Sequence, residues 1–170
     1  MNKKQQKFSK IYDDYVESIY RFIFIKVSSR VTAEDLTSEV FLRTWQTFQQ
    51  KEKEKIKNPK AFLYVTARHL VVDFYRTRDK NRTLPIEDNE DIADSEQQLE
   101  EKEKINSDLA LIQQKLKEIK DNYQDVIIWR YIDGLSIGEI SQILDKSKGT
   151  TRVLIHRAMG KLREQLKDQQ

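Results

Sequence analysis

The chain has 170 residues, of which 35% are charged, and it contains 4 Gly, 2 Pro and no Cys. Long stretches of Glu, Lys, Gln and Leu favour helices, and so few Gly and Pro leave little material for turns between strands. The lack of cysteine excludes disulfides, thiolate metal sites and a cysteine nucleophile, and it fits the cytoplasm. The apolar runs are far shorter than the roughly 20 residues that span a bilayer. We therefore expect an all-α, soluble, cytoplasmic protein without a signal peptide or a membrane span.

Basic and acidic residues are unevenly distributed along the chain. Residues 1–82 carry 18 Lys and Arg against 10 Asp and Glu, residues 83–108 carry 2 against 10, and residues 109–170 carry 11 against 8. Basic segments suit a phosphate backbone, whereas an acidic connector is repelled by it. A solvated linker between ordinary surfaces would give the same pattern. We expect two small helical domains, the first and third of these segments, joined by the second as an acidic flexible linker.

Apolar residues recur at steps of three and four residues along the first basic segment and predict three amphipathic helices. The first covers residues 7–27. The second follows Thr32, which is placed to cap it. The third covers about residues 60–80, because Pro59 preceded by Asn58 is a good helix start. Three helices of this kind make a compact first domain.

Helical periodicity disappears over residues 83–96 and resumes near Leu99. The next apolar stripe consists of Leu109, Ile112, Leu116 and Ile119. A further helix ends at Gly134, and two helices joined by a tight turn follow it. Ser136 is placed to cap the shorter one, and the longer one covers about residues 148–166. This last part of the chain has the length and punctuation of a helix-turn-helix.

The last predicted helix has two distinct faces at about 100° per residue. Its apolar face contains Thr151, Ile155, Ala158, Met159 and Leu162. The residues that we expect to enter the major groove of DNA are Lys148, Gly149, Thr150, Arg152, Val153, His156 and Arg157. Val153 lies at the centre of the outward face, where an apolar group can touch a thymine methyl but cannot form the paired hydrogen bonds of an arginine. A solvated helix with one stray valine is the alternative.

The segment of residues 134–158 reads GLSIGEISQILDKSKGTTRVLIHRA. It resembles the C-terminal DNA-binding region of the extracytoplasmic-function (ECF) sigma factors of bacterial RNA polymerase, which reads the -35 promoter element. The N-terminal domain of that family is similar to AEDLTSEVFLRTWQTF and to NPKAFLYVTARHLVVDFYRTR, residues 33–48 and 58–78. The resemblance covers nearly the whole chain outside the linker, and two separated matches in the correct order are specific.

The resemblance implies a non-enzymatic protein without a cofactor that binds promoter DNA and core RNA polymerase, through the coiled coil of the largest polymerase subunit and the flap. It also implies an anti-sigma factor as an inhibitory partner. In the family the second helix contacts polymerase, and the matching positions are Asp35, Ser38, Glu39, Leu42 and Arg43. The third helix reads the -10 element and assists strand opening, with Phe62, Thr66, Arg68, His69, Asp73 and Arg76 at the matching positions. Side chains of these types can hold an unstacked base, although ordinary surface chemistry is the alternative for each.

The sequence departs from the family pattern at three places. Asp145 and Lys146 occupy the turn where the family typically has Gly and an apolar residue. Val153 with Leu154 replaces a common polar and basic pair, and Ser38 stands where the family often has Gln. The first two departures affect the promoter preference, whereas docking on polymerase is still expected.

Two other classes of function compete with this interpretation. A conventional transcriptional regulator would bind duplex operators unaided through residues 134–163, and its first domain would sense a ligand or dimerise. An enzyme would need converging titratable groups, yet the only histidines, His69 and His156, fall in different domains. His69 and Asp73 have the spacing of two metal ligands on a helix, but a third ligand is not apparent. We therefore expect neither a catalytic site nor a metal site.

Overall fold

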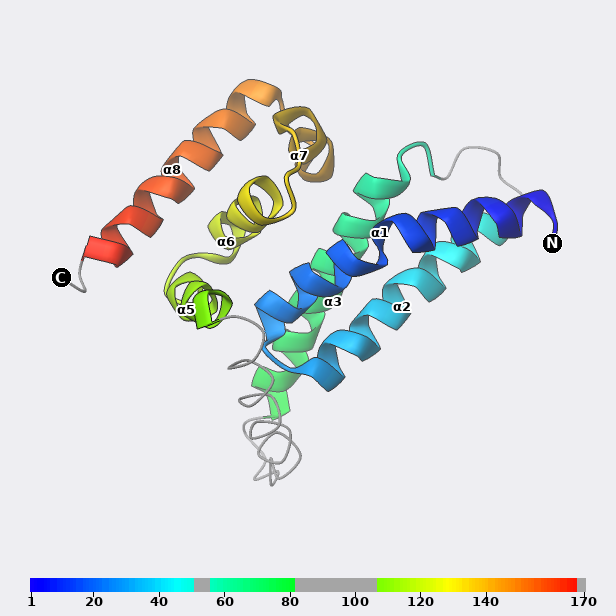
Figure 1. Ribbon diagram of the computed structural model, residues 1–170, viewed down its shortest axis with the longest axis horizontal. Coiled ribbons are helices and arrows are strands. Elements are labelled where there is room, and N and C mark those ends of the chain that lie inside the picture. Colours follow the sequence, from blue (N-terminus) through cyan, green and yellow to red (C-terminus); the bar gives the residue numbers. More distant parts are fainter. Residues whose placement is uncertain (51–55, 82–106, 168–170) are drawn as a thin grey trace. The chain divides into compact units, whose positions relative to one another are not determined.

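The computed structural model describes residues 1–50, 56–81 and 107–167, and these ranges contain helices but no β-strand. The chain divides into two compact units, Met1–Gln98 and Leu99–Gln170, each with its own packed helices (Figure 1). The all-α fold class is confirmed. The predicted linker lies outside the described residues, except for its last two residues, which begin a helix.

Three helices form the first unit and pack on one another: α1 (Lys3–Val27), α2 (Arg30–Gln49) and α3 (Pro59–Asn81). They are blue, cyan and green in Figure 1. The start of α3 is capped as expected, because Asn58 Oδ1 accepts a hydrogen bond from the backbone N–H of Ala61 at 3.1 Å. The most deeply buried side chains of this unit are Ile19, Phe22, Ile23, Ala33, Val40, Leu63, Tyr64 and Ala67.

The turn between α1 and α2 corrects the prediction that Thr32 caps the second helix. Ser28 closes α1 in the left-handed region at φ 58°, and its N–H donates to the carbonyl of Phe24 at 2.8 Å. Ser29 is the actual cap, since its Oγ accepts a hydrogen bond from the N–H of Thr32 at 3.3 Å. The chain therefore reverses within two residues, and α2 begins two residues before Thr32.

The second unit contains α5 (Ser107–Leu116), α6 (Asp121–Ile127), α7 (Ile137–Leu144) and α8 (Lys148–Lys167). Helix α6 continues directly into a short π-helical turn, η1 (Ile128–Ile132). Helix α8 packs against α5, α6 and α7, so it is the central element of this unit. The most deeply buried side chains are Leu116, Val126, Ile128, Trp129, Leu135, Ile140 and Ala158.

The connection from η1 to α7 is fixed by backbone conformation and hydrogen bonds. Gly134 has a positive φ of 70°, as expected for the residue that ends the helix. The N–H of Leu135 donates to the carbonyl of Trp129 at 2.8 Å, and the guanidinium of Arg130 donates to the carbonyl of Leu135 at 3.0 Å. Ser136 forms a capping box at the start of α7, which confirms the predicted cap.

Helix α5 corrects one residue of the predicted apolar stripe. Leu116 and Ile119 are buried, but Ile112 is exposed, and the buried positions beside them are Gln113 and Lys115. One residue corresponds to a rotation of about 100° about the helix axis. The packed side of α5 is thus turned from Ile112 towards Gln113, because the neighbouring helices determine which side of so short a helix is covered.

The hydroxyl of Tyr75 on α3 donates a hydrogen bond to the backbone carbonyl of Lys26 at the end of α1. Tyr75→Phe keeps the ring and removes only this donor, so we expect the free energy of unfolding to fall by about 1 kcal/mol. Urea denaturation followed by circular dichroism measures the change. Tyr131→Phe is the control, because that side chain is exposed. Equal stabilities of the two variants would contradict the prediction.

Candidate nucleic-acid interfaces

The turn between α7 and α8 positions the first residues of α8. Asp145 ends α7 in the left-handed region at φ 53°, a conformation that Gly adopts readily and that Asp tolerates. The sigma-factor-like pattern typically has Gly at this turn, and the left-handed conformation of Asp145 explains why Gly suits the position. Ser147 caps α8, since its Oγ accepts a hydrogen bond from the N–H of Thr150 at 3.1 Å. Its carbonyl accepts another from the hydroxyl of Thr151 at 2.8 Å.

The two faces of α8 lie as the sequence indicates. Thr151, Ile155 and Ala158 are buried, and Met159 and Leu162 are half-buried. All seven candidate residues of this helix are exposed: Lys148, Gly149, Thr150, Arg152, Val153, His156 and Arg157. The structure therefore brings them together on one accessible surface that covers the first three turns of α8 and carries several cations.

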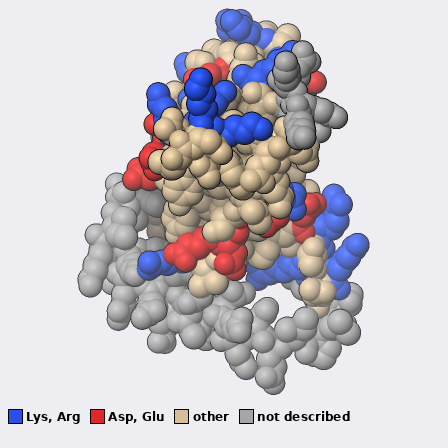
Figure 2. Space-filling view, turned by 90° about the vertical axis from the view of Figure 1, so that its right-hand side faces the viewer, with Lys and Arg blue, Asp and Glu red and all other residues tan. Residues whose placement is uncertain are grey.

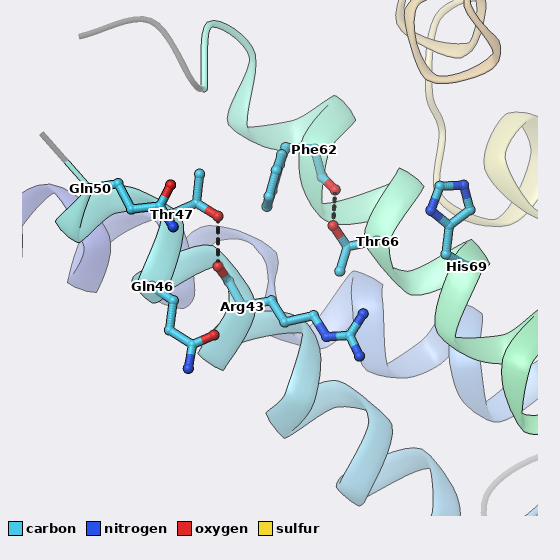
Figure 3. A pocket seen from close by; sticks show the side chains of 7 residues that line it. All are labelled: Arg43, Gln46, Thr47, Gln50, Phe62, Thr66 and His69. Carbon is cyan, nitrogen blue, oxygen red and sulfur yellow. Dashed lines mark hydrogen bonds between the residues drawn. The ribbon is translucent and has the colours of Figure 1, made fainter. Parts of the chain in front are cut away.

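A pocket of about 420 Å³ lies between α2 and α3 (Figure 3). Its lining residues are Arg43, Gln46, Thr47 and Gln50 from α2, and Phe62, Thr66 and His69 from α3. Each set repeats at steps of three and four residues, so each occupies one side of its helix. Three of the six candidate -10 residues thus line one pocket. Arg68, Asp73 and Arg76 are not among its described lining residues.

Hydrogen bonds inside the pocket determine which groups can donate and which can accept. The hydroxyls of Thr66 and Thr47 donate to the carbonyls of Phe62 and Arg43 at 2.7 and 2.9 Å, so both oxygens are offered as acceptors (Figure 3). Arg43 donates through Nε to Glu39 at 2.9 Å and keeps its terminal N–H groups as donors. Together with two glutamine amides and an aromatic ring, these groups match the chemistry that holds an unstacked base.

Three lining residues, Gln46, Thr47 and Gln50, were not expected from the sequence. The sequence did contain a pattern that could have indicated them. They are polar, and helical spacing places them on the same side of α2 as Arg43. The spacing marks a polar side of α2, but it does not show that this side meets Phe62 and its neighbours on α3.

The candidate polymerase-contacting residues divide between two sides of α2. The exposed side contains Val31, Asp35, Ser38 and Leu42. Leu42 is 49% exposed, so this side also offers apolar area. Glu39 is half-buried and pairs with Arg43, which lines the pocket. The structure therefore places Arg43 beside the candidate -10 residues and the other positions on or next to the exposed side.

Other kinds of site would need clustered charges, a set of metal ligands or a long apolar helix. On the face drawn in Figure 2, Lys and Arg side chains gather in patches, and Asp and Glu side chains lie directly beside several of them. Within the described ranges, no group of three or more His, Cys, Asp or Glu side chains is arranged to hold a metal ion. None of the helices in these ranges combines the length and the apolar character that crossing a membrane requires.

Both units match known families. Residues 11–81 match the family described as Sigma-70 region 2, and residues 109–162 match the family described as Sigma-70, region 4. The first match contains the pocket between α2 and α3, and the second contains the exposed face of α8. The fold and the two candidate surfaces thus define a sigma-70-type protein with region 2 and region 4.

Two relatives define the subfamily. The ECF RNA polymerase sigma factor SigW of Bacillus subtilis is 30% identical over an alignment of 174 positions, gaps included. This alignment covers 96% of this chain and 91% of SigW. The ECF RNA polymerase sigma factor BldN of Streptomyces coelicolor is 28% identical over 166 residues. These cover 95% of this chain but 61% of BldN, so the chain spans less than two thirds of that relative. The chain belongs to the ECF RNA polymerase sigma factors, whose regions 2 and 4 bind the -10 and -35 promoter elements.

Two solved structures share the fold. The sigma factor RpoE of Bartonella quintana, in complex with the anti-sigma factor NepR, has a TM-score of 0.65 and 18% identity, with 95% of this chain and 98% of that chain covered. CnrH, in complex with the cytosolic domain of CnrY, has a TM-score of 0.70 and 17% identity, with 98% and 91% covered. The resemblance of this chain to the family is thus confirmed in sequence, and its fold is matched in structure.

Ser147→Ala removes the side-chain acceptor at the start of α8, so we expect the free energy of unfolding to fall by about 1 kcal/mol. Thermal melting of the purified chain measures this loss. Ser147→Thr is the matched control, because threonine retains a hydroxyl at the capping position. An alanine variant as stable as the threonine variant would show that this cap does not stabilise α8.

Proposed function

We propose that this chain directs core RNA polymerase to promoters by binding two promoter elements with two separate surfaces. The exposed face of α8 binds the duplex -35 element, and the pocket between α2 and α3 binds a base of the opened -10 element. The observation that carries this proposal is the difference between the two surfaces. An exposed cationic helix face fits a duplex groove, whereas a pocket with an aromatic ring and mixed donors and acceptors fits a single unstacked base.

The -35 surface combines phosphate binding with contacts to bases. Lys148, Arg152 and Arg157 are exposed cations that attract the phosphates at the rims of the groove. Arg157 also has the length to reach a guanine edge, to which arginine forms two hydrogen bonds. Thr150 and His156 add exposed polar groups on the same surface.

The -10 surface uses the pocket and two further cations of α3, of which Arg76 is exposed and Arg68 is half-buried. A base that leaves the stack lies against the ring of Phe62 and meets the hydroxyl oxygens and amides of the pocket. Arg68 and Arg76 on the same helix bind the phosphates of the opened strand. Asp73 is exposed and does not pair with Arg76 within the described residues, so its carboxylate accepts from a base amino group.

The exposed side of α2 is the proposed docking surface for the coiled coil of the largest polymerase subunit. Asp35 and Ser38 supply polar contacts, and Leu42 supplies apolar area at the centre of this side. Glu39 and Arg43 lie at the border between this surface and the pocket, where their ion pair orients the guanidinium. Docking and base capture then take place on adjacent sides of one helix.

An anti-sigma factor is proposed as an inhibitory partner, because the RpoE protein of similar fold was solved with one. The polymerase flap is proposed as the docking site of the second unit. Promoter binding requires access to the chromosome, so we propose that the chain acts in the cytoplasm and without catalysis of its own. No cofactor or small-molecule substrate is needed for these roles.

Reconstitution with core RNA polymerase decides between this proposal and a conventional regulator. We expect the purified chain to form a complex with core enzyme and to yield transcripts with a defined start on DNA from upstream of its own operon. Core enzyme alone gives the background for comparison. A conventional regulator would bind the duplex unaided and create no new start site. Failure to bind core enzyme, with no start-specific transcript, would contradict the proposed function.

Phe62→Ala removes the ring on which the captured base is proposed to stack. Because stacking contributes about 1–3 kcal/mol per base, we expect open promoter complexes to fall by about five- to 150-fold while binding to the -35 duplex is retained. Permanganate reactivity of thymines near the start site measures opening. Val72→Ala is the control, since Val72 is an exposed residue of α3 outside the described pocket lining. Unchanged opening in the Phe62 variant would rule out the pocket as the base site.

A further inference from the structure

An apolar side chain lies at the centre of the exposed face of α8. Val153 is 49% exposed. At about 100° per residue, Arg157 lies about 40° to one side of it and His156 about 60° to the other, and Arg152 borders the same face. The buried side of α8 points in the opposite direction, so Val153 contributes little to the core. An exposed valine surrounded by cationic and polar side chains offers a partner one apolar contact within a polar surface.

The backbone one turn before Val153 is open to an approaching surface. A Cβ added at Gly149 would meet only Ser147 Oγ at 4.0 Å, so internal packing does not require glycine there. Glycine in a helix is less favourable than alanine by about 1 kcal/mol. Here it leaves the backbone uncovered by any side chain. A partner can therefore approach this side of α8 more closely than a larger residue would allow.

The chemistry of Val153 selects among the groups that DNA presents in the major groove. Guanine, adenine and cytosine present hydrogen-bond donors and acceptors there, whereas thymine adds a 5-methyl group. Valine forms no side-chain hydrogen bonds, so pressing it against a polar base edge would leave a buried donor or acceptor unsatisfied. The thymine methyl group is the matching apolar contact, and the surrounding cations attract the phosphates on either side.

We propose that Val153 determines promoter preference by packing against the 5-methyl group of a thymine in the -35 element. This inference rests on the proposed function of α8 and names the base chemistry that the helix selects. Leu154, the neighbouring departure from the family pattern, is half-buried and lies about 100° from Val153. It is therefore placed to pack within the second unit, and Val153 alone carries the apolar contact.

The test removes single methyl groups from the DNA. The chain, assembled with core RNA polymerase, first selects its -35 element from duplexes randomised in that region. Each thymine of the selected element is then replaced in turn by deoxyuridine, which lacks only the 5-methyl group. At one position we expect binding to weaken about three- to fivefold, the factor that corresponds to burial of one methyl-sized group. Competition against the unmodified duplex measures this ratio.

Three variants test whether Val153 is the side chain that distinguishes thymine from deoxyuridine. Val153→Ala is expected to bind the thymine and deoxyuridine duplexes equally at that position. Leu166→Ala is the matched control, because Leu166 is 48% exposed and lies about three and a half turns further along α8. Leu111→Ala removes apolar area from an exposed residue of α5, which lies in the same unit but outside the proposed surface. Both of these variants are expected to keep the wild-type ratio, and circular dichroism checks that all three variants fold.

The outcomes separate this inference from the proposed function. If the wild-type holoenzyme selects an element but binds thymine and deoxyuridine equally at every position, Val153 does not read a methyl group and the proposed function stands. If Val153→Ala keeps the discrimination, or Leu111→Ala loses it, the inference is also overturned. A holoenzyme that selects no element at all overturns both proposals.

Discussion

The face that a helix buries fixes the rotation of the helix about its own axis. Both proposed DNA-binding surfaces, the exposed face of α8 and the pocket beside α3, depend on this constraint. In α8, burial of Thr151, Ile155 and Ala158 leaves one direction for the residues on the opposite side. A rotation by one residue, about 100°, would expose Ile155, and full burial of such a side chain contributes about 1.5–3 kcal/mol. Helix α3 obeys the same rule, because burial of Leu63, Ala67 and Leu70 directs its pocket-lining side towards α2. The residues that stabilise each unit thus also orient its proposed contacts with DNA.

Features with local causes could be predicted from the sequence. Gly134 ends a helix through its positive φ, and Ser136 and Asn58 begin helices through hydrogen bonds to groups three residues away. The start of α2 shows where this reasoning fails. Ser29 and Thr32 both offer a hydroxyl, and the left-handed conformation of Ser28 decides between them. Glycine usually marks such a conformation in a sequence, but here a serine adopts it, so the pattern carried no signal.

Features with tertiary causes could be predicted only in part. The stripe on α5 was wrong at Ile112 because the packed side of a ten-residue helix depends on its neighbours. Three of the seven lining residues, Phe62, Thr66 and His69, were expected to share one side of α3, because their spacing follows the helical period. The other four come from α2, and spacing along one helix contains no information about which side of another helix it meets. Arg43 shows how a position in the family pattern and a position in the fold can differ. The family resemblance implied that Arg43 contacts polymerase, whereas packing places it in the lining of the pocket.

Two small surfaces on one chain bind more selectively than either does alone. Once one surface is bound, binding of the second becomes intramolecular, which raises the overall affinity by about 10²–10⁴ when the spacing of the two sites fits. The length of the connecting segment sets this gain, and its charge disfavours contacts of its own with DNA. Residues 83–108 carry 2 basic and 10 acidic side chains, so the phosphates repel this segment at every spacing. The charge distribution therefore favours the two units for the proposed DNA contacts, just as burial leaves one side of α3 and one side of α8 for them. In the proposed function, promoter selection then depends on the few side chains that these two sides expose.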